Sequence, residues 1–116
     1  MKYYTPEHQW FDQDLYRVGL SSFARGELGQ IVYLQMPKVG DKIEEGQILC
    51  ILESTKSAAD VYAPYSGIVS ELNPEALNFI NEDPEKNGWL VTLIPDPAIK
   101  SDRFLTPIQY HEMISM

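Results

Sequence analysis

The sequence contains a single cysteine, Cys50, few basic residues and no long apolar run. One cysteine excludes an internal disulfide framework and any metal cluster built from several cysteines. The longest apolar run spans residues 48–52 and is far too short to cross a bilayer. Nine Lys and Arg against seventeen Asp and Glu give a net charge of −8. This charge argues against binding to nucleic acids or anionic membranes and favours basic surfaces on partner proteins.

The sequence also lacks the features of a targeting segment. No apolar stretch follows Lys2, as a secretory signal would require, and the acidic Glu7, Asp12 and Asp14 come too early for an Arg-rich transit peptide. We therefore expect a cytoplasmic location, or the mitochondrial matrix if a presequence has been removed. A length of 116 residues is enough for one core, so we expect a single domain over residues 1–116.

Turn-forming residues divide the chain into short pieces, as in a mainly β protein. Eight prolines and seven glycines separate short apolar segments. We expect strands at residues 8–11, 15–20, 31–36, 48–52, 61–63, 68–72 and 89–94, with Lys42-Ile43 leading from one turn to the next. The run 48–52 is apolar at every position, which predicts a strand covered on both faces. Gly46–Leu52 and Gly88–Ile94 both place a glycine before an apolar strand, which suggests two similar half-sheets in a flattened sandwich or barrel.

Three short helices are also expected. Ser22 is the expected cap of a helix that runs to Leu28, with Gly29 in the left-handed position after it. Asn73 before Pro74 predicts a second helix over residues 75–80. Thr106 with Gln109 three residues later forms the pattern of a capping box, which predicts a C-terminal helix at about 106–115.

The hairpin expected at about 48–64 contains the most informative residue, Lys56. Small side chains surround this lysine, and apolar or β-branched strands lie on either side. Composition alone favours a solvated turn lysine with no special role. The alternative is a lysine at a hairpin tip that enters the active site of another protein.

The neighbours of Lys56 resemble the lipoyl-lysine hairpin of the glycine cleavage system H protein family. The matching positions are Glu53-Ser54, Lys56, Ala58, Asp60, Tyr62-Ala63-Pro64 and Ser66-Gly67. The likeness continues in order at Tyr4-Thr5, Glu7-His8, Trp10, Val18-Gly19, Ala24, Leu28-Gly29, Ile31-Val32, Pro37, Val39-Gly40, Asn81, Asp83-Pro84 and Gly88-Trp89-Leu90. It therefore covers most of the chain, with Thr55, Ser57 and Gly26 among the departures from the family pattern.

The resemblance implies a lipoyl/biotinyl-type sandwich and a non-catalytic carrier in glycine catabolism. Lipoic acid would be attached to Lys56 as a swinging arm, a post-translational modification. The partners implied are a pyridoxal-phosphate glycine decarboxylase, a folate-dependent aminomethyltransferase, a dihydrolipoyl dehydrogenase and the lipoate-attaching enzyme. Glu53 and Asp60 would guide the modifying enzyme.

Other readings of the same residues remain open. The chain could be an H-like lipoyl carrier or scaffold that relays lipoyl groups to other enzymes, or an unmodified interaction module. Biotin is a weaker match, because Thr55 and Ser57 stand where biotinyl domains have methionines. His8 and His111 lie far apart without further ligands, so we expect no metal site, and Cys50 in an apolar strand is expected to be an unreactive thiol.

Overall fold

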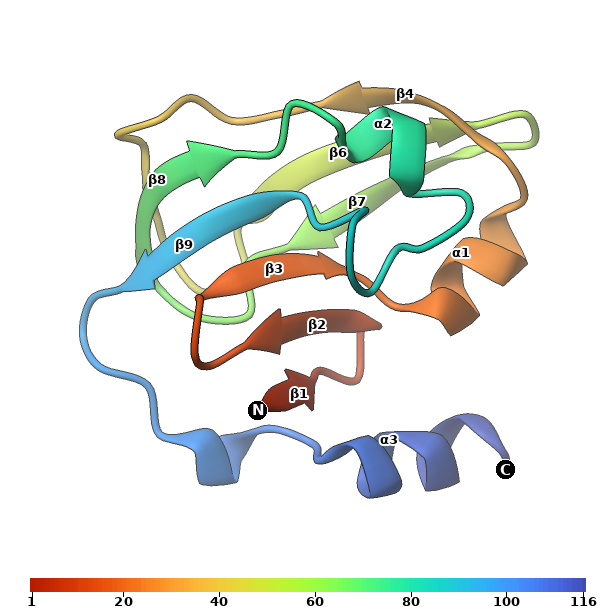
Figure 1. Cartoon of the computed structure of the whole chain (residues 1–116). Coiled ribbons are helices and arrows are strands. Elements are labelled where there is room, and N and C mark those ends of the chain that lie inside the picture. The colour runs from red at the N-terminus through yellow and green to blue at the C-terminus, as the bar shows by residue number, and fades with distance from the viewer.

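The computed structural model describes all residues 1–116 as a sandwich of two antiparallel sheets (Figure 1). The strands are β1 (Lys2–Tyr4), β2 (Gln9–Asp12), β3 (Arg17–Leu20), β4 (Ile31–Gln35), β5 (Lys42–Ile43), β6 (Ile48–Ser54), β7 (Ala58–Tyr62), β8 (Gly67–Leu72) and β9 (Val91–Pro95). The helices are α1 (Ser22–Leu28), α2 (Ala76–Phe79), the 3-10 turn η1 (Ser101–Arg103) and α3 (Pro107–Ile114).

Six strands form one sheet in the order β1-β2-β3-β9-β8-β5, and three form the other in the order β4-β6-β7. The expected mainly β fold is confirmed, as a sandwich whose sheets do not close into a barrel. A core of sixteen buried residues lies between the sheets and includes Phe11, Leu52, Val61 and Leu93. Burying these side chains supplies the main free energy that stabilises the sandwich.

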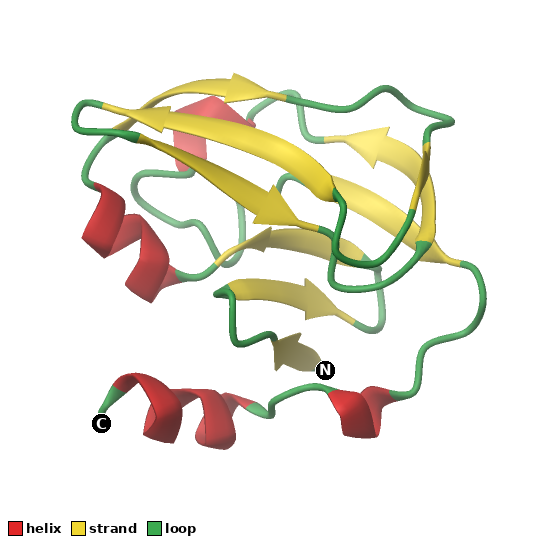
Figure 2. Cartoon of the chain, turned by 180° about the vertical axis from the view of Figure 1, so that it is seen from behind, coloured by secondary structure: helices red, strands yellow, loops and turns green.

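A second apolar cluster lies where α3 packs against β1. Tyr4, Trp10, Trp89 and Tyr110 are all buried there, and the Tyr4 and Tyr110 rings stack with centroids 4.3 Å apart. In Figures 1 and 2, α3 and the tip of the β6–β7 hairpin lie on opposite sides of the molecule. The C-terminal helix therefore supports the end of the fold that is remote from Lys56.

Several details of the sequence interpretation are corrected by the structure. Strands β1 and β5 were not expected. Strand β1 pairs with β2, and Tyr4 also bridges to Leu105, whereas β5 pairs with β8. The cap of α1 is Ser21, not Ser22: the Ser21 side chain accepts from the Ala24 amide at 3.2 Å. Helix α2 begins only at Ala76, because the backbone at residues 73–75 forms a turn in which the Asn73 side chain accepts from the Glu75 amide.

The apolar run 48–52 is not covered on both faces. A bulge between Ile48 and Cys50 in the pairing with β7 turns Leu49 and Cys50 inward one after the other. As a result Ile48 remains 49% exposed, and Ile51 is half-buried on the side of the sheet that faces away from the core. The expected capping box of α3 is confirmed, with Thr106 and Gln109 bonded reciprocally.

Candidate functional site

Lys56 lies in the three-residue connection between β6 and β7. The two strands pair in antiparallel register from Ile48↔Tyr62 at the base to Glu53↔Ala58 near the tip. Thr55, Lys56 and Ser57 then make the turn itself, and all three are exposed. The long hairpin therefore carries the lysine to the edge of the molecule (Figure 1).

The side chain of Ser54 closes this turn. Its Oγ accepts hydrogen bonds from the backbone amides of Lys56 at 3.1 Å and Ser57 at 3.0 Å, and it donates to the Ser57 carbonyl at 3.1 Å. The Ser54 amide donates to the same carbonyl at 2.8 Å. Serine hydroxyls commonly stabilise turns in this way. The backbone that bears Lys56 is thus fixed locally, although the sequence has no Asn-Gly turn signal at this place.

The corner between α1 and β4 supports the tip from a second direction. The Thr55 amide donates to the Gln30 carbonyl at 3.0 Å. Gly29 has a φ of +82°, and a Cβ placed on it would stand 3.5 Å from Cε and 3.7 Å from Cδ of Lys56. The aliphatic stem of the lysine therefore passes over a stretch of bare backbone. Gly29 ends α1 as expected, but its ψ of −160° is not that of the left-handed helical conformation that was expected. Its contact with Lys56 has no signal in the sequence.

The amine at the end of that stem has no partner. No salt bridge or hydrogen bond involves the Nζ of Lys56, whereas the Nζ of Lys2 donates to the Glu85 carbonyl at 2.7 Å and lies 4.6 Å from the centre of the Trp10 ring. A lysine amine must lose its proton before it attacks an acyl group. An exposed and unpaired amine leaves room for another enzyme to supply the base that removes this proton.

Glu53 and Asp60 lie on the same side of the hairpin, the side that faces away from the core. Glu53 pairs with Ala58, and Asp60 pairs with Ile51, so the two carboxylates share the face opposite the buried Leu52 and Val61. Both are exposed, and neither forms a salt bridge. The arrangement offers no enclosed carboxylate pair for acid–base catalysis.

The other reactive residues have structural surroundings. Cys50 is buried, and burial raises the pKa of its thiol to about 12, so the thiolate is not formed near neutral pH. His8 Nδ1 lies 2.7 Å from the Tyr110 hydroxyl, whereas His111 is an exposed residue of α3. No group of three His, Cys, Asp or Glu side chains is arranged to hold a metal ion. None of the helices is long and apolar enough to cross a membrane.

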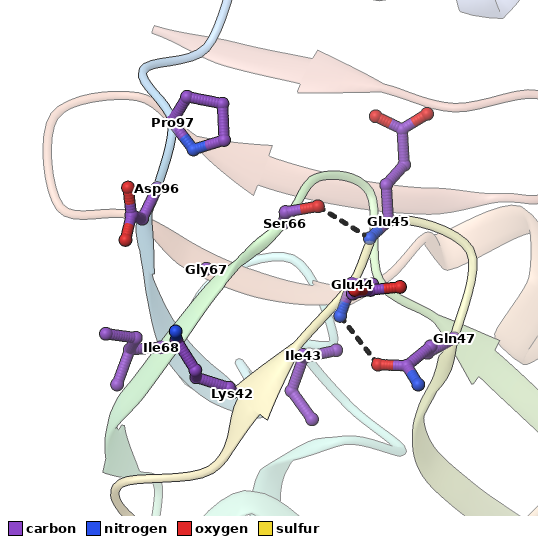
Figure 3. A pocket seen from close by; sticks show the side chains of 10 residues that line it. All are labelled: Lys42, Ile43, Glu44, Glu45, Gln47, Ser66, Gly67, Ile68, Asp96 and Pro97. Carbon is purple, nitrogen blue, oxygen red and sulfur yellow. Dashed lines mark hydrogen bonds between the residues drawn. The ribbon is translucent and has the colours of Figure 1, made fainter.

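The largest hollow of the surface is not associated with Lys56. It has a volume of about 640 Å³ and lies beside β5 and β8, between residues that include Lys42, Glu44 and Asp96 (Figure 3). The backbone amides that face it are already bonded: Glu44 to the Gln47 side chain at 2.6 Å and Glu45 to Ser66 Oγ at 2.9 Å. These two backbone amides are therefore not free to bind an anion.

Fold and site together define a class of protein: a small β sandwich that displays one unpartnered lysine on an exposed hairpin and encloses no cleft around it. Comparisons with known proteins identify the family. The family described as glycine cleavage H-protein matches residues 2–116, and the chain belongs to that family.

Individual relatives agree over nearly the whole length. The glycine cleavage system H protein of Halalkalibacterium halodurans is 36% identical over 117 residues, covering 97% of this chain and 91% of that protein. The H protein of Staphylococcus carnosus is 37% identical over 116 residues, covering 96% and 92%. The crystal structure of the H protein from Mycobacterium marinum superposes with a TM-score of 0.87 at 32% identity, covering 99% of this chain and 97% of that chain.

Proposed function

We propose that this chain is the lipoyl carrier of a glycine cleavage system and that Lys56 is its attachment site. One observation carries the proposal: in a member of this family, the lysine at the hairpin tip has an exposed, unpaired amine on a backbone that is held from two sides. The residues around it fit the group, because Thr55, Ser57 and Ala58 are small and leave the amine accessible.

Lipoic acid joined to Lys56 by an amide would supply a dithiolane that accepts an aminomethyl group and is reoxidised after its release. The chain itself positions the root of this arm. Ser54 and the Gln30 carbonyl fix the turn, and the Gly29 backbone lies along the lysine stem. A fixed root with a flexible arm gives the reactive sulfur a high effective concentration at each partner. The protein is in this view a non-catalytic subunit.

The partners follow from this role. A pyridoxal-phosphate glycine decarboxylase would load the arm, a folate-dependent aminomethyltransferase would unload it, and a dihydrolipoyl dehydrogenase would reoxidise it. A lipoate-attaching enzyme would first acylate Lys56. The net charge of −8 favours basic docking surfaces on these enzymes, mainly through faster encounter.

Two measurements, made one after the other, test the proposal. The purified chain is incubated with a lipoate-attaching enzyme, lipoate and ATP, and its intact mass and peptide map are recorded. We expect one lipoyl group on Lys56; no adduct, or an adduct on another lysine, would contradict the proposed site. The lipoylated chain is then combined with a glycine decarboxylase, and bicarbonate exchange into glycine is measured. A lipoylated chain that supports no exchange would favour the relay carrier over the glycine cleavage carrier.

A further inference from the structure

A smaller hollow of the surface gathers basic side chains. It has a volume of about 300 Å³ and is lined by residues of β1, β2 and β3, of the β2–β3 turn and of the loop between α2 and β9. Its charged lining residues are Lys2, Asp12, Arg17, Glu85 and Lys86. Three of the nine Lys and Arg residues of a chain with net charge −8 therefore border one small space. We refer to it as the basic hollow.

The two carboxylates of the basic hollow already have partners within the chain. The Glu85 carboxylate accepts from the Tyr4 hydroxyl and lies 3.6 Å from the Nζ of Lys2. The Asp12 carboxylate accepts from the backbone amide of Asp14 at 2.8 Å. Lys2 is thus the cation that Glu85 neutralises, and the charge of the other two cations is left over.

The guanidinium of Arg17 is held in place but has no acceptor. Arg17 is half-buried, and its guanidinium lies 4.4 Å from the centre of the Trp89 ring, which is itself buried. It forms no ion pair, even though Asp12 borders the same hollow. An arginine stacked on an aromatic ring keeps the N–H groups at its edge free. Two of these groups together match the paired oxygens of a carboxylate or a phosphate.

The loop between α2 and β9 adds further free donors on a fixed backbone. The Asp83 carboxylate accepts from the Asn87 amide at 3.2 Å, and the Pro84 carbonyl accepts from the Trp10 indole at 3.1 Å. The side chains of Lys86 and Asn87 are exposed, and Lys86 forms no ion pair. An ammonium group and a side-chain amide therefore border the same hollow as the Arg17 guanidinium.

We propose that the basic hollow is a binding site for a small oxyanion, a compound that carries a phosphate or a carboxylate group, with Arg17 and Lys86 as its cationic contacts. A volume of about 300 Å³ is at the lower end of the range for small-molecule sites. The net charge of −8 does not prevent this binding, because charges more than about 8 Å away are largely screened at physiological ionic strength.

The inference does not rest on the proposed carrier function. The β6–β7 hairpin contributes no residue to the basic hollow, so an anion bound there does not touch Lys56. The site would add a small-molecule ligand to a chain whose other proposed interactions are with enzymes.

The two tryptophans of the chain make the test direct. Trp10 borders the hollow, and Trp89 lies against the Arg17 guanidinium, so intrinsic fluorescence reports on the site. Inorganic phosphate and malonate are titrated separately into the full chain, with sodium chloride at equal ionic strength as the reference, and the Tm is recorded at each concentration. Arg17→Gln and Lys86→Gln remove the two cations. Lys42→Gln, at an exposed lysine outside the hollow, is the matched control.

We expect a saturable response of the wild type to at least one of the two anions, beyond that of chloride. A response to phosphate alone would assign phosphate compounds to the site, and a response to malonate alone would assign carboxylates. The Kd should rise about tenfold or more in Arg17→Gln and about three- to fivefold in Lys86→Gln, with no change in Lys42→Gln. Saturating anion should also raise the Tm of the wild type, because it binds the folded state.

Two results would overturn the inference. One is a response to both anions that equals that of chloride. The other is the same Kd in the folded Arg17→Gln and Lys42→Gln variants. Lipoylation at Lys56 is measured in parallel on Arg17→Gln and should proceed at the wild-type rate, so that failure of the anion site and failure of the carrier function are seen separately.

Discussion

At the α3 end of the molecule, polar side chains are bonded to each other, whereas at the β6–β7 tip they are left free. The Tyr110 hydroxyl lies 2.7 Å from both Ser21 Oγ and His8 Nδ1. Glu85 accepts from the Tyr4 hydroxyl and from the Ser22 amide. At the tip, hydrogen bonds hold only the backbone and the small Ser54 hydroxyl.

The two lysines at these ends show what the difference means for function. The Nζ of Lys2 donates to the backbone carbonyl of Glu85 and lies 3.6 Å from the carboxylate of the same residue. Its amine would have to leave these partners and the Trp10 ring before it could react. Lys56 has no such contacts to lose. Side-chain interactions therefore make the α3 end rigid, whereas the β6–β7 tip presents a free side chain on a fixed backbone.

The largest expected effect comes from removing the free amine. Lys56→Arg should abolish lipoylation, because a guanidinium is not acylated in this way. Its stability should stay within about 0.5 kcal/mol of wild type, since the side chain is exposed. Lys42→Arg, at another exposed lysine, is the control and should be modified normally. Intact mass and denaturant unfolding measure both outcomes; a lipoyl group on the Lys56→Arg variant would show that the acceptor is a different lysine.

The opposite effect is expected at the α3 end. Trp10 is 2% exposed, and its indole N–H donates to the carbonyls of Leu20 and Pro84, each at 3.1 Å. Trp10→Ala should lower the free energy of unfolding by about 3–5 kcal/mol. The folded fraction should still accept lipoate at Lys56. Leu15→Ala, at a residue that is 54% exposed, provides the control for stability. Loss of lipoylation in the folded fraction of Trp10→Ala would mean that the two ends are coupled.

Alkaline pH should destabilise the protein through three tyrosines whose pKa values are raised: Tyr4 and Tyr110 at the α3 end, and Tyr65 in the main core. Burial, and then the hydrogen bond to Glu85, raise the pKa of Tyr4 above that of an unfolded tyrosine, and burial also raises the pKa of Tyr110. A raised folded-state pKa gives stability that is complete below the unfolded pKa of about 10 and is lost as the pH rises above it.

We therefore expect the free energy of unfolding to fall between pH 10 and pH 11.5, by an amount on the order of 1 kcal/mol once solvent screening is allowed for. Tyr4→Phe should show a shallower decline over the same range, measured by urea unfolding at each pH. Equal slopes for the variant and the wild type would show that Tyr4 does not contribute to the pH dependence.

The sequence predicted the mainly β sandwich because its turn residues and apolar runs are local signals. It did not predict interactions that depend on distant residues. Strand β1 is short and becomes a strand through its pairing with β2 and the bridge to Leu105. Ser21 and Ser22 are equally good caps by type, and Ser21 is the one that also meets the Tyr110 hydroxyl.

The same distinction applies to the candidate site. Lys56, Glu53 and Asp60 were found from the order of residues along one hairpin, and the structure places all three in exposed positions there. The support from Gly29 and Gln30 depends on the antiparallel pairing of β4 with β6, in which Ile31 lies opposite Ser54. No local pattern in the sequence specifies that pairing. The role of all three residues in lipoylation stays a prediction.

The smallest expected effect tests whether the backbone corner at Gly29 guides the lysine. Gly29 and Gly46 have φ values of +82° and +85°, so replacing either by Ala strains the backbone by about 1–3 kcal/mol. Only at Gly29 would the new Cβ touch Lys56; at Gly46 nothing lies within 4 Å. Because 3.5 Å is an ordinary contact distance, the Cβ should restrict rotation of the lysine stem without displacing the hairpin.

We therefore expect Gly29→Ala to lower kcat/KM for lipoylation by about two- to fivefold, equivalent to about 0.4–1 kcal/mol, while Gly46→Ala lowers stability alone. Acylation rates are compared at a temperature where both variants are fully folded. Equal acylation rates for the two variants would mean that Gly29 does not guide the lysine. In that case the turn closed by Ser54 is enough to position Lys56 for acylation, and the corner after α1 contributes only to stability.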